Sequence, residues 1–546
     1  MKSSRRSASL AVPALLAAAF AAAQAPPPPQ QEPPTFRESV EVRVMDLDVA
    51  VTDSRGNPVP DLTKEDFRIT VDGKPVPIDY FTRVAEGTIH APDLATASPD
   101  LVLAEYRKGP DAYIPRQYLL YVDVGNLSPN SRKRGLDALR DLVTRMGPSD
   151  LARVVLFDRR GKEQTQWTSS KEQLFGALDK IEKSGVGMSR LMAETQAIHQ
   201  IDNMPARARA SVAHSYAEQE RTEVETLLRD MSAELTTLTG LPGRRAFVLV
   251  TGGFDTTPGY AMYEYALGRF NAGLQSFDSR SAAPMIEALT RQANASDVTF
   301  YTVDARGLNA EGGGAADDGP LISRPGVSFT ARTESQAALL SLAGETGGLA
   351  LLNTNGLNRG LERVYQDTST YYSVGVTLAN LPPSGTRKVS VSVTRPGLTV
   401  RSRRSYSVKS AGDRAGDVTV AALRSNVRYQ GIPVTLATAA PTKAKKFYTV
   451  PVVITVPAKS LTFLPAGKDM KAATDLYFAV MDDSGNMSNI NREEASFSLP
   501  ADAPADAPVK YTATLSVRKG NARIVVNVRD RETGKMGTAK ADLHVE

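Results

Sequence analysis

Two acidic residues directly follow apolar segments that are typical of buried strands, and they are the first candidates for chemistry. Asp123 follows the run RQYLLYV, and Asp304 closes the run TFYTV. If both strands are parallel, their carboxyl ends meet at one edge of a sheet, so the two carboxylates share that edge. A carboxylate in this position can ligate a cation or pair with a guanidinium. For Asp304 we expect an ion pair with Arg306.

Most catalytic and metal chemistry is excluded by residue type. The chain has no cysteine and only four histidines, so thiolate sites and cysteine nucleophiles are ruled out and a zinc site has few possible ligands. No Gly-x-Ser-x-Gly elbow and no phosphate-binding P-loop occur. His199 and His214 lie in a polar insertion and are expected to be solvent-exposed. We therefore expect no enzyme activity, no catalytic residue and no cofactor, with Mg²⁺ or Ca²⁺ as the only alternative.

Two short segments have the composition of calcium loops. Residues 53–57 read DSRGN and residues 482–486 read DDSGN. Both lack a distant glutamate at the spacing that a calcium loop needs, so hairpin turns are the favoured interpretation.

Three arginines form the densest basic run in the second half of the chain. Arg401 and Arg403 would share one face of a strand, while Arg404 points to the other face. The pattern favours a solvated edge strand protected by charge, and an anionic envelope partner is the alternative.

Residues 116–368 alternate between apolar runs and amphipathic helices. The strands are continuous apolar runs, which is typical of a parallel sheet covered by helices on both faces. Three polar insertions, residues 182–218, 253–281 and 305–331, are expected to be loops near strand ends, where such folds bind ligands.

The flanking segments alternate with a period of two and contain turn residues. Residues 36–85 predict a small β module, residues 370–410 predict strands that pack on it, and residues 415–546 predict a β-sandwich. We expect a multidomain α/β plus β protein.

The amino-terminal segment predicts export. Residues 1–25 combine a basic start with an apolar run and end in Ala-Gln-Ala, which fits a cleaved signal peptide. Its removal lowers the formal net charge from +5 to +2, so the charge does not indicate nucleic-acid binding. Residues 26–35 are proline-rich and predict a tether. No later apolar stretch reaches 18 residues, so we expect no membrane span after cleavage and a secreted or periplasmic location.

Residues 36–408 resemble the VWFA-related domain proteins of Acidobacteria, which contain a von Willebrand factor A-like domain. The resemblance depends on an ordered set of segments: VAVTDSRGNPVPDLTKEDFRITVDGKPVPI, YVDVGNLSPNSRKRGLDALRDLV, GRRAFVLVTGGF, TFYTVDARGL, SLAGETGGLA, YYSVGV and RPGLTVRSRRSY. It implies a Rossmann-like domain in a secreted or envelope-associated bacterial protein, usually without enzyme activity.

The resemblance also implies a place for a divalent cation. Family members that bind one use an Asp-x-Ser-x-Ser loop, a threonine and a second aspartate after the fourth strand. In this chain Asp123 is retained, but Gly125 and Leu127 replace the two serines, and Gly252 stands where the second aspartate is expected. The metal-ion-dependent adhesion site is therefore predicted to be degenerate. If a cation does bind, we expect Asp123, Ser128 and Asp255 to hold it.

These observations lead to one favoured function and two alternatives. We expect an exported, non-catalytic protein that binds a protein partner through the strand-end loops of the α/β domain. The residues that we expect to bind the partner are Asp123, Asn126, Ser128, Thr251 and Asp255. The alternatives are a metal-dependent adhesion module with a rebuilt cation site and a purely structural envelope component.

Overall fold

The computed structural model describes most of the chain beyond its amino-terminal segment. The described residues are 44–90, 113–158, 161–184, 189–268, 281–308, 325–377, 385–424, 429–444, 447–466, 468–483, 485–504 and 506–545. The predicted signal peptide, the tether and residues 36–43 of the first β module lie outside them. Among the described residues, no helix combines the length and apolarity that a membrane span requires.

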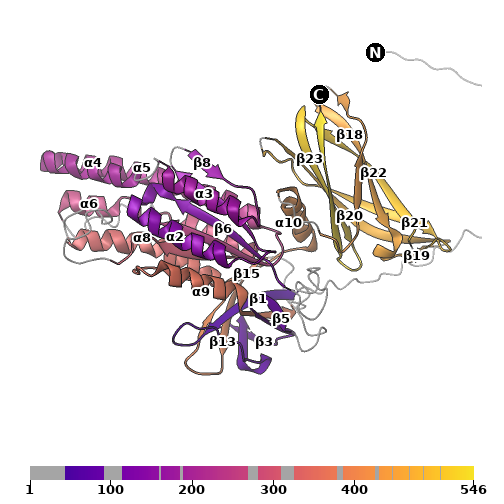
Figure 1. Ribbon diagram of the computed structural model, residues 1–546, viewed down its shortest axis with the longest axis horizontal. Helices are drawn as coiled ribbons and strands as arrows, with labels where there is room; N and C mark the ends of the chain where they lie inside the picture. Colours follow the sequence, from indigo (N-terminus) through magenta and orange to yellow (C-terminus); the bar gives the residue numbers. More distant parts are fainter. Residues whose placement is uncertain are drawn as a thin grey trace, which may run out of the picture. The chain divides into compact units, whose positions relative to one another are not determined.

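A mixed sheet of six strands forms the centre of the α/β domain (Figure 1). Its order is β11-β10-β9-β6-β7-β8; neighbouring strands are parallel except for the edge pair β7–β8, which is antiparallel. The strands are β6 (Arg116–Asp123), β7 (Leu151–Asp158), β8 (Gly161–Gln164), β9 (Arg244–Thr251), β10 (Val298–Asp304) and β11 (Ala350–Leu351). The predicted parallel sheet is thus present.

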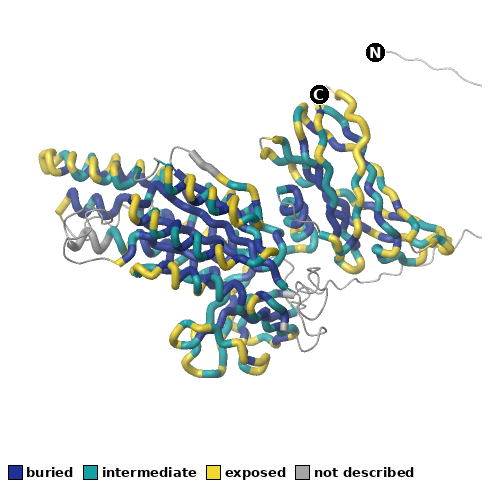
Figure 2. The backbone as a smooth tube through the Cα atoms, in the orientation of Figure 1, coloured by how far each residue is buried: buried dark blue, intermediate teal, exposed yellow. Residues whose placement is uncertain are grey.

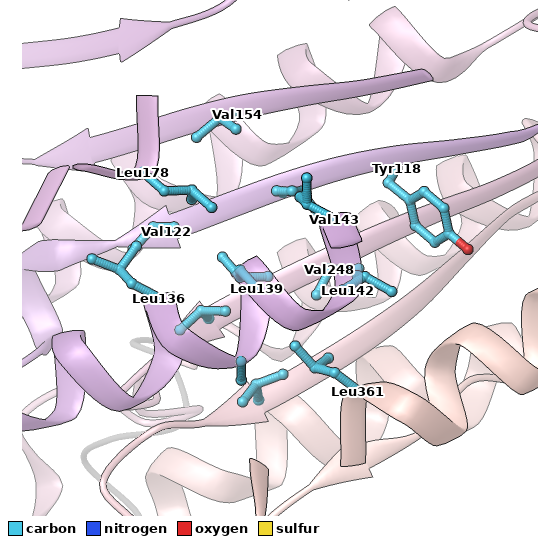
Figure 3. Close-up of a cluster of buried hydrophobic side chains, with 14 of the residues drawn as sticks. Tyr118, Val122, Leu136, Leu139, Leu142, Val143, Val154, Leu178, Val248 and Leu361 are labelled. Carbon is cyan, nitrogen blue, oxygen red and sulfur yellow. The ribbon is translucent and has the colours of Figure 1, made fainter. Parts of the chain in front are cut away.

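Helices cover both faces of this sheet, because both faces of its strands are apolar. Alternate residues of β6 enter two different hydrophobic cores: Leu120 lies in one, and Leu119 in the other. The first core is closed by α2 (Pro129–Arg145), α3 (Lys171–Lys183) and α9 (Leu357–Ser369), and Figure 3 shows Leu136, Leu139 and Leu361 packed against Val122 and Val248. The second core is closed by α5 (Ala206–Leu238), α7 (Ala283–Ala295) and α8 (Pro325–Thr346). Figure 2 shows the strands as buried and the outer helix surfaces as exposed.

The chain leaves β6 and β9 toward opposite faces of the sheet. After β6 it forms α2 over the first core, whereas after β9 it forms α6 (Tyr260–Leu267) and then α7 over the second core. β6 and β9 are neighbours, so their connections diverge at the carboxyl edge between them. In open α/β sheets this switch point is where ligands bind.

The polar insertions expected as loops contain helices. Residues 182–218 include α4 (Ser189–Asn203) and the first part of α5, and residues 253–281 include α6. The prediction of loops there was wrong, because weakly amphipathic helices have little apolar periodicity to detect. Figure 1 shows α4, the first part of α5 and α6 extending beyond the sheet; we call these three segments the helical extension. A small core of its own, including Ile201, Ala213 and Met262, holds it together.

Strands from before and after the α/β domain interleave in one β module. Strand β12 (Tyr371–Thr377) lies between β1 (Val44–Thr52) and β4 (Tyr80–Ala85), with Leu47 opposite Val374. In the second sheet β13 pairs with β2, with Val391 opposite Ile69. The other elements are η1 (Lys64–Asp66), β2 (Phe67–Val71), β3 (Lys74–Val76), β5 (Thr88–His90), β13 (Gly385–Val393), β14 (Thr399–Arg401) and β15 (Ser405–Val408). The two sheets enclose one hydrophobic core.

The arginine run attaches this module to the α/β domain. Arg401 forms two hydrogen bonds of 2.5 Å to Asp367 of α9, and Arg403 pairs with Asp297 just before β10. Arg403 is buried, whereas Arg404 is exposed. The expectation of a solvated edge was therefore wrong for Arg401 and Arg403, because both form ion pairs with carboxylates of the α/β domain.

The last part of the chain forms two antiparallel sheets around a separate core. One sheet is built on β18, which pairs with β16, β17 and β22, and the other on β20 and β23. The strands are β16 (Thr435–Thr438), β17 (Thr442–Ala444), β18 (Phe447–Pro457), β19 (Leu464–Ala466), β20 (Asp469–Asp482), β21 (Asn491–Pro500), β22 (Pro508–Val517), β23 (Gly520–Asp530) and β24 (Met536–Val545), with η6 at Ala458–Ser460.

A helix, α10 (Ala411–Arg424), precedes these sheets, so the start of the segment 415–546 is helical and does not belong to the predicted β-sandwich. Its alanine-rich face packs Ala422 and Leu423 against Ala479 and Val525 of the second sheet. The valines of this segment have a high β propensity, but packing against the sheet favours a helix and overrides that propensity.

Candidate functional site

Three of the five candidate residues meet at the carboxyl edge between β6 and β9. Asp123 ends β6 and is 2% exposed. Its Oδ2 accepts hydrogen bonds from Asn126 Nδ2 at 2.6 Å and from Thr251 Oγ1 at 2.8 Å. The backbone N–H of Gly253 donates to Thr251 Oγ1 at 3.0 Å. The two neighbouring strands therefore share one buried hydrogen-bond network at their tips.

Ser128 has a local structural role at the same edge. The short turn η3 (Val124–Asn126) leads from β6 to α2, and Ser128 is the N-cap of that helix. Its Oγ accepts a hydrogen bond from the Ser131 backbone N–H at 3.2 Å. Serine is favoured here because its hydroxyl satisfies an amide that has no partner within the helix.

Asp255 is bound to an arginine that the sequence did not single out. Arg190 of α4 lies with its Nη2 2.8 Å from Asp255 Oδ1 and its Nε 2.8 Å from Glu220 Oε1 of α5. Its Nη1 donates to the Gly253 carbonyl at 3.0 Å. Burial alone would lower the pKa of Arg190, but the carboxylates of Asp255 and Glu220 hold that pKa well above its ordinary value. Arg190 thus joins the helical extension to the loop after β9.

Asp304 forms the ion pair that the sequence suggested. Its two oxygens accept from Arg306 Nε and Nη2 at 2.9 Å each, and Gln336 Nε2 donates to Oδ2 at 2.8 Å. Burial alone would raise the pKa of Asp304, but the guanidinium and the amide keep it below its ordinary value. This bidentate pair makes Asp304 a structural anchor of the loop after β10.

A small cavity lies among these groups. Its volume is about 60 Å³. The turn before α2 lines one side of the cavity, and the helical extension and α8 line the others. The polar residues of its lining include Asn126, Ser128, Arg190, Glu194, Asp255, Arg306, Arg332 and Ser335. Burial raises the pKa of Glu194, the neighbouring Asp255 adds to that rise, and Arg190 opposes it. The cavity has room for a few water molecules or one small polar group, not for a metabolite.

The residues present do not fit a cation between β6 and β9, where the family resemblance implies one. Asp123 Oδ2 is already engaged by Asn126 and Thr251. A Cβ at Gly252 would lie 2.0 Å from the Asn126 carbonyl oxygen, so no aspartate side chain can stand there. Among the residues that the structure describes, no group of three or more His, Cys, Asp or Glu side chains is arranged to hold a metal.

Sequence reasoning missed the partners that come from the insertion. Arg190 lies on a helix inside the insertion that was expected to be a loop, and Glu220 lies on α5 just after that insertion, so nothing in the local pattern connects them with Asp255. The two histidines of that insertion, His199 and His214, are exposed, as the sequence predicted.

Comparisons with known proteins add little to this picture. No protein-family model matches the chain, and no curated protein matches it. Among solved structures, an aerotolerance-related membrane protein from Bacteroides fragilis is 11% identical over 46% of this chain and 98% of that chain, with a TM-score of 0.23. The pilus adhesin SpaC from Lactobacillus rhamnosus GG is 8% identical over 74% of this chain and 53% of that chain, also at 0.23. A β-glucuronidase from Bacteroides uniformis is 9% identical over 34% of this chain and 20% of that chain, at 0.15. TM-scores this low carry no argument about function.

Proposed function

We propose that the chain is an exported, non-catalytic binding protein whose von Willebrand factor A-like domain recognises a protein partner at the carboxyl edge of its sheet. The observation that carries this proposal is the distribution of exposed apolar side chains. Six large hydrophobic residues are exposed in the described part of the chain. Leu267 and Leu308 lie on the segments that follow β9 and β10, and Met192 and Met204 lie on and just after α4 of the helical extension.

The charges at this edge also favour binding over catalysis. Asp255 pairs with Arg190, and Asp304 pairs with Arg306. A carboxylate held in a short ion pair is a poor general base, because the pair favours its charged form. Exposed apolar side chains and paired charges are both features that support a binding role for this edge.

Site-specific crosslinking would test this function. A photoreactive residue placed at Met192 or Leu267 should give a discrete adduct with one partner in cells that express the chain. The matched control is Leu340 of α8, which is 55% exposed and belongs to none of the strand-end segments. Equal adducts from all three positions, or none from Met192 and Leu267, would indicate a structural component of the envelope and would reject the binding role.

A further inference from the structure

The two sheets of the last β-sandwich have different outer faces. On the sheet built on β20 and β23, α10 packs against the outer face, where Leu423 lies in one small core with Val525 (Figure 1). The same face carries ion pairs, since Asp475 pairs with Arg492 and Arg529. The outer face of the other sheet, built on β18, is open and nearly uncharged, as the next two paragraphs show.

Alternation along the strands defines the outer face of the β18 sheet. From Val450 to Val456 every second residue of β18 is buried in the core of the sandwich, so the residues between them point outward. Residues directly opposite each other on neighbouring strands share a face, and Thr512 of β22 lies opposite Val453. On the other side of β18, β16 and β17 continue the same face. Its threonines are Thr435, Thr442, Thr449, Thr455, Thr512 and Thr514, and we call this outer face of β16, β17, β18 and β22 the threonine face.

The threonine face is depleted of charge. Among the described residues that point outward from these four strands, Lys510 near one end is the only charged side chain. The others are threonine, serine, alanine, valine, proline and Phe447, which is 45% exposed. Charged residues usually make up about 25–35% of the surface of a soluble domain. Charge depletion is characteristic of the centre of a protein interface, so the threonine face has the composition of a contact surface.

The threonine face has the area that a specific interface needs. β18 has 11 residues, so at about 3.3 Å per residue the face is about 36 Å long, and three strands about 4.8 Å apart make it about 14 Å wide. A face of about 500 Å² on each of two molecules buries about 1,000 Å² in total. That value is the lower limit for a specific protein interface, and it favours a weak, reversible association.

A second copy of the chain suits this face. Two identical uncharged faces bring no like charges together, whereas a strongly charged partner finds little opposite charge here. Two sheets of the same twist pack face to face about 10 Å apart, with their strands about 30° from parallel. The threonine methyl groups pack in such a layer, and the hydroxyl groups bond to the other sheet or to bridging water.

We propose that the threonine face is a homodimer interface, in which the β18 sheets of two copies pack against each other. The proposal rests on the last β-sandwich alone. It is therefore independent of partner binding at the carboxyl edge of the central sheet.

Sedimentation of the purified full chain tests this proposal without any other protein. As the concentration rises from about 1 to 100 µM, we expect the sedimenting species to change from monomer to dimer, because an interface of this size favours a micromolar dissociation constant. A chain that stays monomeric over the whole range overturns the proposal.

A matched pair of substitutions shows which face forms the dimer. Thr512→Arg places a charge on the threonine face, where the dimer would bring two such charges together, and it should weaken dimerisation by about tenfold or more. Ser496→Arg adds the same charge at an exposed position of β21, on the other sheet, and should dimerise as the wild type does. Because Thr512 is exposed, both variants should keep the thermal midpoint of the wild-type monomer. Equal dimerisation by both variants overturns the proposal.

The chain has no cysteine, so a single introduced cysteine gives a position-specific readout that does not depend on the arginine variants. With a short bifunctional thiol reagent, Thr514→Cys should give a covalent dimer and Ser496→Cys should give little. Equal dimer yields from the two positions contradict the proposal. It also fails if, in cells, Thr514→Cys is joined to a different protein and not to its own copy, since that protein would then cover the face.

Discussion

Ion pairs lie at both edges of the central sheet, but they hold different parts together. At the amino edge, Arg116 lies 2.6 Å from Asp150, and Arg244 pairs with Asp48 of the β module. At the carboxyl edge, Arg190 pairs with Asp255 and lines a small cavity. Pairs at the amino edge attach the β module to the α/β domain, whereas this pair at the carboxyl edge positions the loop after β9, which belongs to the surface that we propose binds a partner.

The largest effect is expected at the amino edge. Arg116 is 1% exposed, bonds to Asp150 and Tyr113, and lies with its guanidinium carbon 4.4 Å from the ring centroid of Tyr365. Arg116→Ala leaves the Asp150 carboxylate buried without its cation, which should lower the free energy of unfolding by about 3–5 kcal/mol. Urea denaturation measures this change. The control Arg145→Ala removes an exposed ion pair with Glu362 and should change it by less than about 1 kcal/mol. Similar losses for both variants would contradict the structural role of the amino edge.

The next largest difference in stability is expected between two neighbouring arginines of the arginine run, Arg403 and Arg404. Arg403 donates to the Asn294 carbonyl at 3.2 Å and pairs with Asp297, whereas Arg404 is exposed beside Glu345. Arg403→Ala should lower the free energy of unfolding by about 2–3 kcal/mol, because it removes a buried hydrogen-bonded charge. Arg404→Ala should stay within about 0.5 kcal/mol of the wild type. Equal effects in thermal or urea unfolding would mean that the run is a solvated edge after all.

A glycine substitution tests the close packing between β6 and β9. In Gly252→Ala the new Cβ would meet the Asn126 carbonyl, so the loop must shift, at a cost of about 1–3 kcal/mol. Gly344→Ala in α8 meets nothing within 4 Å and should be neutral or stabilising by up to about 1 kcal/mol. If Gly252→Ala proved as harmless as Gly344→Ala, there would be room for a ligand there, and our exclusion of a cation between β6 and β9 would fail.

The smallest effect is the acid dependence of Asp304. Arg306 holds the pKa of Asp304 in the folded protein below its ordinary value of 3.8. The ionised carboxylate therefore stabilises the fold fully at neutral pH. This stabilisation declines as the pH falls from 3.8 through the lower pKa of the folded state. Asp304→Asn should therefore lose less stability than the wild type between pH 5 and pH 2, roughly the range in which native carboxylates titrate. Thermal midpoints across this range measure the difference, and parallel curves for the two proteins would contradict the assignment.

The sheet could be predicted from sequence because buried parallel strands are continuous apolar runs, as in β6, β9 and β10. Parallel order also brings Asp123 and Thr251 to one edge, and the structure joins them by a hydrogen bond of 2.8 Å. These inferences need only strand direction and adjacency, both of which follow from the pattern.

Other features could not be predicted, because they depend on long-range contacts. Asp255 pairs with Arg190 from a helix whose sequence is polar and weakly periodic. Likewise, Arg403 was assigned to solvent because the sequence does not show that Asp297 would face it.

The most direct test asks whether partner binding depends on the carboxyl edge that Arg190 organises. In a chain with a photoreactive residue at Leu267, Arg190→Met should reduce the partner adduct, because it releases the loop after β9 from the helical extension. Arg404→Met, which removes an exposed arginine elsewhere, should leave the adduct unchanged. Equal adducts from both variants would contradict the claim that this edge binds the partner.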